Sequence, residues 1–306
     1  MGPIQTALIV LMVFFSSTAW SEAADDSTPR GKITVLHAAS LADLLNEVKT
    51  AFERQNPGVE VLLESGASLS LVRQITDLHK DADVIAVADQ SLIPSMLIPS
   101  HAEKSTDFLT EQIALIVAQN ARHADTITAG NWPEILMKSD VGFGISNPET
   151  APAGYRALMV WQLSERHYKK PGLYRQLHEK LPMKNIRSNA VALMTLLKAG
   201  ELDYIFDYAS LAKQNGLKVI LLPPQVSLGD PTFANVYASV SVEVPGKEPG
   251  SKTMIKGAPV VYSVASLKNA SNPAAAKAFI DFIIGSGGRS LMVDLGMTPL
   301  SVASRK

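Results

Sequence analysis

The sequence predicts an α/β protein in which mainly parallel sheets are covered by helices. Short apolar runs alternate with amphipathic stretches of helical spacing, and small or polar loops join them. This alternation is typical of parallel sheets with helices on both faces. No shift in composition marks a linear boundary along the 306 residues. The uniform composition favours two lobes linked by crossing strands over consecutive domains.

The N-terminal third of the chain shows the alternation most clearly. Residues 33–37 are a predicted strand, and residues 41–55 carry apolar side chains on one helical face. A second strand follows at 59–63, then a helix at about 69–78 and a third strand at 82–88.

Later segments repeat the same pattern over the rest of the chain. Helices are predicted to begin at residue 132 and to span 154–165, 190–198 and 274–284. Strands are predicted at 113–117, 141–145, 204–206, 219–222, 236–244 and 260–264.

Composition and charge exclude several classes of function. The chain has 28 basic and 29 acidic residues and a net charge of −1, so it has no overall attraction for nucleic acid or for an anionic membrane. It contains no cysteine, which excludes disulfides, cysteine-ligated zinc and thiol nucleophiles. The six histidines are scattered without metal-binding spacing, and Glu201 and Asp203 are predicted to lie in a solvated turn.

The N-terminal segment has the pattern of a signal peptide, predicted over residues 1–23. Residues 7–15 are apolar, too short a run to span a bilayer, and small residues precede a cleavage site after Ala23. No Lys or Arg stands before the apolar run. Because no cysteine is available for a lipid anchor, we expect a free periplasmic protein with no membrane insertion.

Small or polar residues mark four predicted helix starts. These are Ala39-Ser40, Ala67-Ser68, residues 151–154 and residues 188–190. Helix N-termini carry unpaired N–H groups and a partial positive charge, so several that converge form an anion site. Simple helix capping is the alternative at each position: Ser40 with Asp43 has the pattern of a capping box, and Ser188 or Asn189 of an N-cap.

Further motifs make the chain resemble a known family, the molybdate- and tungstate-binding proteins of ABC transporters, most of all their tungstate/molybdate branch. The resemblance runs over nearly the whole mature chain in family order. The matching stretches are His37-Ala38-Ala39-Ser40-Leu41, Gly66-Ala67-Ser68-Leu69 with Val72-Arg73, residues 82–84 and 88–94, Ser146-Asn147-Pro148 with Pro152-Ala153-Gly154-Tyr155-Arg156, Gly200-Glu201-Leu202-Asp203-Tyr204 with Asp207-Tyr208, and Gly257-Ala258-Pro259-Val260-Val261-Tyr262.

The resemblance implies a type II periplasmic-binding-protein fold that closes on a dehydrated oxyanion, either molybdate or tungstate. Lobe I would hold residues 31–112 and 258–306, and lobe II residues 113–257. Ser40 and Ser68 match the ligand-binding serines, while Ala153 and Ala190 match positions whose backbone N–H groups bind the anion. Neighbouring candidates for lining the site are Ala39, Ala151, Asn189 and Tyr208.

Carboxylates are the point at which the chain departs from the tungstate/molybdate branch. That branch bonds the metal through two carboxylates, but Ala151 stands in place of one and Asp207 matches the other. The loop that contains Ala151 resembles bacterial molybdate proteins, which use hydrogen bonds alone. We expect recognition by serine and backbone donors, and two alternatives stay open: Asp207 as a metal ligand, and Glu149 as a replacement carboxylate.

The predicted function is therefore transport: a monomeric, cofactor-free solute-binding protein that delivers its oxyanion to an ABC permease. The same fold with sulfate, phosphate or a small organic anion is the main alternative. A secreted serine hydrolase is disfavoured, because no Gly-x-Ser-x-Gly sequence surrounds Ser40 or Ser68. A sensor without a transport role is a further alternative.

Overall fold

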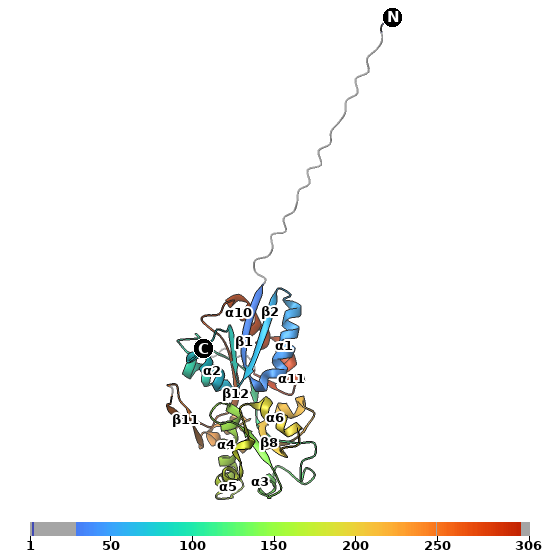
Figure 1. The fold of residues 1–306 in the computed structure, drawn as a ribbon, viewed down its shortest axis with the longest axis vertical. Coiled ribbons are helices and arrows are strands. Elements are labelled where there is room, and N and C mark those ends of the chain that lie inside the picture. The colour runs from blue at the N-terminus through green and yellow to red at the C-terminus, as the bar shows by residue number, and fades with distance from the viewer. Residues whose placement is uncertain (1, 3–28, 249, 301–306) are drawn as a thin grey trace.

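The computed structural model describes residues 2, 29–248 and 250–300, and the predicted signal peptide, apart from Gly2, lies outside this part of the chain. The described residues form two sheets flanked by helices, stacked along the long axis of the molecule (Figure 1). We call the six-stranded sheet with its helices the first lobe, and the five-stranded sheet with its helices the second lobe. The predicted α/β class is confirmed.

The first lobe is built on a sheet with the strand order β13-β4-β12-β3-β1-β2. β1 pairs in parallel with β2 and β3, whereas β12 runs antiparallel between β3 and β4. The strands are β1 (Gly31–Ala38), β2 (Val59–Gly66), β3 (Val84–Val87), β4 (Thr106–Glu111), β12 (Val260–Ser266) and β13 (Thr298–Pro299).

The second lobe contains a sheet with the order β7-β6-β8-β5-β9, in which β5 runs antiparallel to both of its neighbours. Most strands of each sheet point one way; β12 and β13 run against the others in the first sheet and β5 in the second, and β5 and β12 belong to the crossing connections. The strands are β5 (Ile113–Val117), β6 (Phe143–Ser146), β7 (Ile186–Arg187), β8 (Tyr204–Tyr208) and β9 (Lys218–Leu221); a separate hairpin pairs β10 (Ser241–Pro245) with β11 (Lys252–Lys256).

The lobes are joined where strands pass directly from one sheet to the other. β4 ends at Glu111 and β5 begins at Ile113, so Gln112 alone separates the two sheets. Its carbonyl accepts the N–H of Ala209 at 3.0 Å. The chain returns to the first lobe before β12, where Val260 donates to the carbonyl of Leu228 at 2.8 Å. These crossings place the carboxyl ends of both sets of parallel strands against one another.

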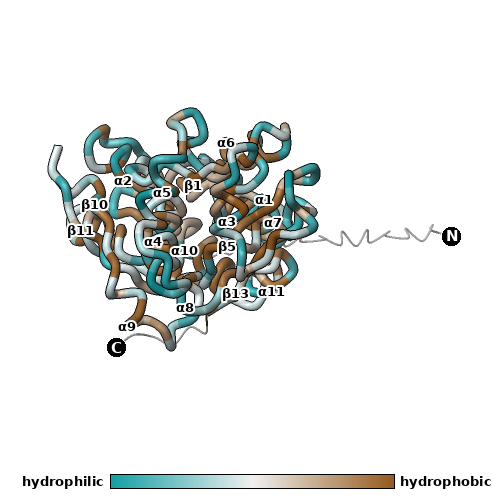
Figure 2. Tube along the Cα trace, turned by 90° about the horizontal axis from the view of Figure 1, so that it is seen from below, coloured by the Kyte–Doolittle hydropathy of each residue, from teal (hydrophilic) through white to brown (hydrophobic). Residues whose placement is uncertain are grey.

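Helices cover both sheets and complete the cores. In the first lobe they are η1 (Ala39–Leu41), α1 (Ala42–Gln55), α2 (Ser68–Thr76), η2 (Ile93–Leu97), α10 (Pro273–Ile284) and α11 (Ser286–Asp294). In the second lobe they are α3 (Trp132–Leu136), α4 (Pro152–His167), α5 (Leu173–Lys180), η3 (Met183–Asn185), α6 (Ala190–Lys198), α7 (Ala209–Gln214), α8 (Pro224–Ser227), η4 (Pro231–Phe233) and α9 (Ala234–Tyr237). Hydrophobic segments lie mainly inside and hydrophilic ones on the outer loops (Figure 2).

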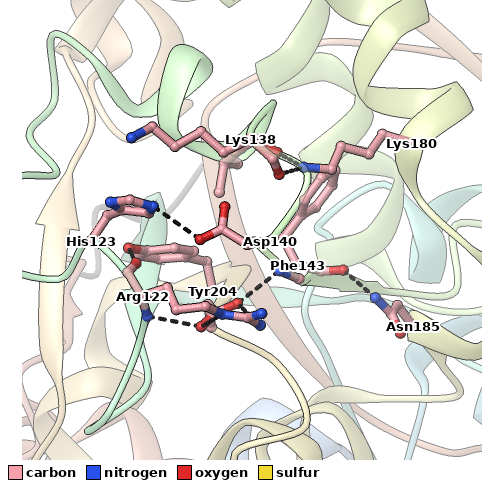
Figure 3. A network of polar contacts seen from close by, with 11 residues as sticks. Arg122, His123, Lys138, Asp140, Phe143, Lys180, Asn185 and Tyr204 are labelled. Atoms are coloured by element: carbon pink, nitrogen blue, oxygen red, sulfur yellow. Dashed lines mark hydrogen bonds and ion pairs between the residues drawn. The ribbon is translucent and has the colours of Figure 1, made fainter.

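Two local predictions were wrong. The predicted strand at 236–244 is instead the helix α9 followed by β10, because Tyr237 turns inward and donates its hydroxyl proton to the carbonyl of Pro224. Asp203 does not lie in a solvated turn: it is buried, with Arg122 donating to its Oδ1 from both N and Nε at 2.9 Å. This pair belongs to the network of Figure 3, at the end of the second sheet where β6 and β8 begin.

Candidate functional site

A small cavity of about 20 Å³ lies where the carboxyl ends of the strands of both lobes meet. The space suits a ligand of a few atoms, because a single water needs about 10–15 Å³. All of the candidate residues line it except Asp207 and Glu149. The lining residues are Ala38, Ala39, Ser40, Gly66, Ala67, Ser68, Ala88, Ser146, Ala151, Pro152, Ala153, Asn189, Ala190 and Tyr208.

Four helical segments begin at this cavity: η1, which leads into α1, and then α2, α4 and α6. The first N–H groups of a helix have no partner within it, so these ends present donors to the cavity. Ala153 lies at the second position of α4 and Ala190 at the first of α6. The residues at the N-cap positions of η1, α2 and α4 are alanines and supply no capping side chain.

The capping alternative is therefore wrong for Ser40 and correct for Asn189. Ser40 lies inside η1 and makes no cap, whereas the Asn189 side chain accepts the N–H of Ala192 at 3.0 Å. Ser68 is the first residue of α2, and Ala67 occupies the capping position. The hydroxyls of Ser40 and Ser68 thus do not cap the N-terminus of a helix.

Both serine hydroxyls are buried and held by a neighbour from another element. Ser68 Oγ accepts the N–H of Ala88 at 3.0 Å, which leaves its own proton free to donate into the cavity. Ser40 Oγ lies 2.9 Å from the Tyr262 hydroxyl. The pairing of β12 with β4 shifts register between Tyr262 and Ser263, and such a bulge re-aims side chains.

Two further hydroxyls face the cavity: Tyr208, which the sequence analysis named as a lining candidate, and Ser146, which it missed. Ser146, at the end of β6, is buried, and its Oγ has no hydrogen-bond partner among the described residues. Tyr208 ends β8 and accepts a hydrogen bond from Arg156 Nη1 at 2.9 Å, so its proton is free to donate. Burial raises the pKa of Tyr208, which keeps this donor protonated. Ser146 and Tyr208 share a sequence feature that could have identified them as site residues: each is a hydroxyl residue at the last position of a buried parallel strand.

Arg156 and Asp89 form a buried ion pair that joins the two lobes beside the cavity. Arg156, on α4, donates from Nη2 to Asp89 Oδ2 at 3.1 Å, and the Tyr155 hydroxyl donates to the same oxygen at 2.5 Å. Asp89 follows β3 of the first lobe. Leu69 of the first lobe also donates to the carbonyl of Thr150 of the second at 3.0 Å. The structure is therefore a closed arrangement of the lobes.

The two carboxylates considered from sequence lie outside the cavity lining. Asp207 is fully buried; its Oδ1 accepts the N–H of Tyr208 at 2.9 Å, and its Oδ2 has no partner among the described residues. Glu149 is exposed, and its Oε1 lies 3.5 Å from Lys252 Nζ. The cavity wall thus contains neither a carboxylate nor a cationic side chain.

Gly154 lets α4 begin very close to the end of β6. A Cβ at this position would lie 2.2 Å from the carbonyl oxygen of Ser146 and 2.7 Å from the carbonyl carbon of Asn147. Because both atoms are backbone, no side-chain rotation relieves the overlap.

We expect Gly154→Ala to weaken ligand binding, because the start of α4 must move away from β6 and take the Ala153 N–H with it. A hydrogen bond to a charged group is worth roughly 1.5–3 kcal/mol, so its loss lowers affinity by about 10- to 100-fold. Gly130→Ala serves as the control, because it lies away from the cavity and a Cβ there would meet only Thr128 Oγ1 at 3.8 Å. The check is calorimetry on both variants. Affinity equal to that of the unaltered protein in Gly154→Ala would contradict the argument.

A larger cavity of about 400 Å³ lies on the other side of the Asp89–Arg156 pair, between η2, α4 and the β10–β11 hairpin. Its walls are mainly apolar and include Leu92, Met96 and Met159. Within residues 29–248 and 250–300, no helix is long and apolar enough to cross a bilayer, and no three acidic or histidine side chains gather into a metal site.

Comparisons with known proteins agree with this architecture. Residues 33–298 match the family described as bacterial extracellular solute-binding protein, and the chain belongs to that family. Proteins of this family bind a solute and work with ABC transporters; they are not enzymes. The chain is 39% identical to an uncharacterized solute-binding protein of Petrotoga mobilis, over 98% of this chain and 92% of the relative.

Some of the similar proteins bind molybdate or tungstate. The chain is 35% identical to the molybdate/tungstate-binding protein WtpA of Thermococcus kodakarensis, over 96% of this chain and 90% of that protein. Among solved structures, the periplasmic molybdate-binding protein of Azotobacter vinelandii is similar with a TM-score of 0.64 at 17% identity, covering 88% of this chain and 100% of that one. The predicted resemblance and the periplasmic-binding-protein fold are confirmed.

Proposed function

We propose that this protein captures molybdate or tungstate as a dehydrated dianion between its lobes and delivers it to an ABC importer. The observation that carries the proposal is a small cavity between the lobes whose donors are hydroxyls and helix N-termini, with no charged side chain in its wall. Such neutral donors suit a fully deprotonated anion, because each donates a proton and none needs to accept one.

The donors are sufficient to bind a dianion tightly. The hydroxyls of Ser40, Ser68, Ser146 and Tyr208 converge with the backbone N–H groups of Ala153 and Ala190. Hydrogen bonds to charged groups contribute roughly 1.5–3 kcal/mol each. Five or six of them reach the roughly −12 kcal/mol of nanomolar binding after the ordering costs of association.

We assign recognition to hydrogen bonds alone, with the oxyanion kept tetrahedral. Ala151 supplies no carboxylate, Asp207 stands behind the lining, and Glu149 points to Lys252. Selection against sulfate, which carries the same charge, then depends on the size of the cavity and the longer metal–oxygen bonds of molybdate and tungstate.

Residues 1–23 act as a signal peptide, and the mature chain works as a free monomer in the periplasm. Lobe closure, held by the Asp89–Arg156 pair, gives the transporter a surface that differs from that of the open protein.

Calorimetry on the purified mature protein tests which anion the protein binds. We expect molybdate and tungstate to bind at least 100-fold more tightly than sulfate or phosphate at equal concentration. Sulfate binding as tight as molybdate binding would assign the site to another oxyanion. Absence of heat and of any rise in melting temperature with all four anions would end the proposal.

A further inference from the structure

Two carboxyl groups are buried together behind the cavity, at the point where the chain crosses between the lobes. Asp207 lies on β8, and Glu111 ends β4 just before the crossing residue Gln112. Asp207 is 0% exposed and Glu111 7% exposed. Asp207 Oδ2 and Glu111 Oε1 each have no hydrogen-bond partner among the described residues. An unpaired oxygen on each of two neighbouring buried acids is a feature that oxyanion binding by the lining residues does not explain.

Two tyrosines separate these acids from the ligand cavity. The rings of Tyr208 and Tyr262 meet edge to face with centroids 5.3 Å apart. The Tyr208 hydroxyl reaches the cavity wall, and the Tyr262 hydroxyl reaches Ser40 at 2.9 Å. The charge of Asp207 acts on both phenols and on Glu111. The acids are thus one side chain away from the anion.

Within the part of the chain that the structure describes, no cationic side chain forms an ion pair with Asp207 or Glu111. Arg156, from α4, faces Tyr208, but its guanidinium is bound to Asp89 and to the carbonyl of Ala88. Glu111 faces Asp207 from β4, Tyr262 faces it from β12, and β5 contributes Ala114 opposite Asp207.

Burial raises the pKa of Asp207 to about 7. Burial also raises the pKa of Glu111 to about 7, and the charge of Asp207 adds to this shift. Both groups therefore exchange protons near neutral pH, and the ionised form of Asp207 disfavours ionisation of Glu111. An added negative charge nearby disfavours the ionised forms further.

We propose that the protein binds one proton together with each oxyanion dianion, and that this proton resides on the Asp207–Glu111 pair. The inference rests on the proposed function. A dianion that enters the cavity repels the ionised pair through a medium of low dielectric, and one proton from solvent lowers that repulsion by neutralising one of the two carboxylates. Binding therefore adds one dianion and one proton, a net charge of −1, to the ligand-free protein. Neither carboxyl group bonds the metal atom of the oxyanion.

The first test measures proton uptake by the unaltered protein. Molybdate is titrated at several pH values in buffers of different ionisation enthalpy, and the slope of observed heat against that enthalpy gives the protons bound. We expect about one proton at pH 8 and about none at pH 5.5, where the pair is already protonated. Affinity should fall roughly tenfold per pH unit above pH 7.

Variants locate the proton. Asp207→Asn should reduce uptake at pH 8 by at least half and raise affinity there about tenfold toward its value at pH 6. Glu111→Gln should give a smaller change in the same direction, and it keeps the test available if Asp207→Asn does not fold. Asp43→Asn is the matched control: it removes an exposed carboxylate at the start of α1 and should leave the uptake unchanged.

The outcomes separate this inference from the proposed function. Tight molybdate binding with no proton uptake between pH 6 and 8.5 overturns the inference alone. Affinity that rises with sodium while no proton is taken up also overturns it, because a metal cation would then neutralise the pair. Uptake that persists unchanged in both variants places the proton elsewhere. Failure to bind any of the four anions ends the proposed function instead.

Discussion

Arg156→Met is expected to lower the free energy of unfolding of the closed protein by about 3–5 kcal/mol. The variant leaves Asp89 buried with only the Tyr155 hydroxyl and the Ser91 N–H and hydroxyl as donors. It also removes the group that fixes the Tyr208 hydroxyl. Chemical denaturation at saturating molybdate measures the loss, because the pair joins the lobes in their closed arrangement.

A double variant and a surface control define what the Arg156 result means. Arg156→Met combined with Asp89→Asn should recover part of the loss, because the buried charge is then gone. Arg175→Met breaks an exposed pair with Glu179 on α5, whose atoms are 3.9 Å apart, and should change stability by less than about 0.5 kcal/mol. A loss below about 1 kcal/mol in Arg156→Met would show that the pair does not stabilise the closed lobes.

Ser40→Ala and Ser68→Ala should each weaken oxyanion binding by about 10- to 100-fold. Each removes one hydrogen bond to a dianion, which is worth roughly 1.5–3 kcal/mol. The combined variant need not show the product of the two effects, because both hydroxyls contact the same ligand. Calorimetry with molybdate provides the measurement.

The matched control for these serines is Ser164→Ala. Ser164 is a buried serine on α4 that does not line the cavity, and we expect unchanged affinity there. If Ser40→Ala and Ser68→Ala bind as tightly as Ser164→Ala, hydroxyl recognition is refuted even though the site itself stands.

Most of the helices and strands were predictable because their signals are local. Residues 190–198 were expected as a helix and are one, and the strand expected at 204–206 extends only two residues further. The prediction failed at 236–244, where alternating apolar residues suit a strand as well as a helical turn followed by a strand. Which of these forms there depends on the contact of Tyr237 with Pro224, 13 residues away.

The sequence by itself determined the α/β class, the four helix starts with small residues, and the serines and alanines at them. These features depend on hydrophobic periodicity and on the backbone preferences of neighbouring residues, which are local in the chain. Only the tertiary structure showed that Ser146 faces the cavity, that Arg156 and Asp89 join the lobes, and that Glu111 lies behind the site with Asp207. These partners are far apart in the chain: Asp89 and Arg156 are separated by 67 positions in the numbering. Burial and charge act through space, so side chains acquire these roles only when the two lobes close.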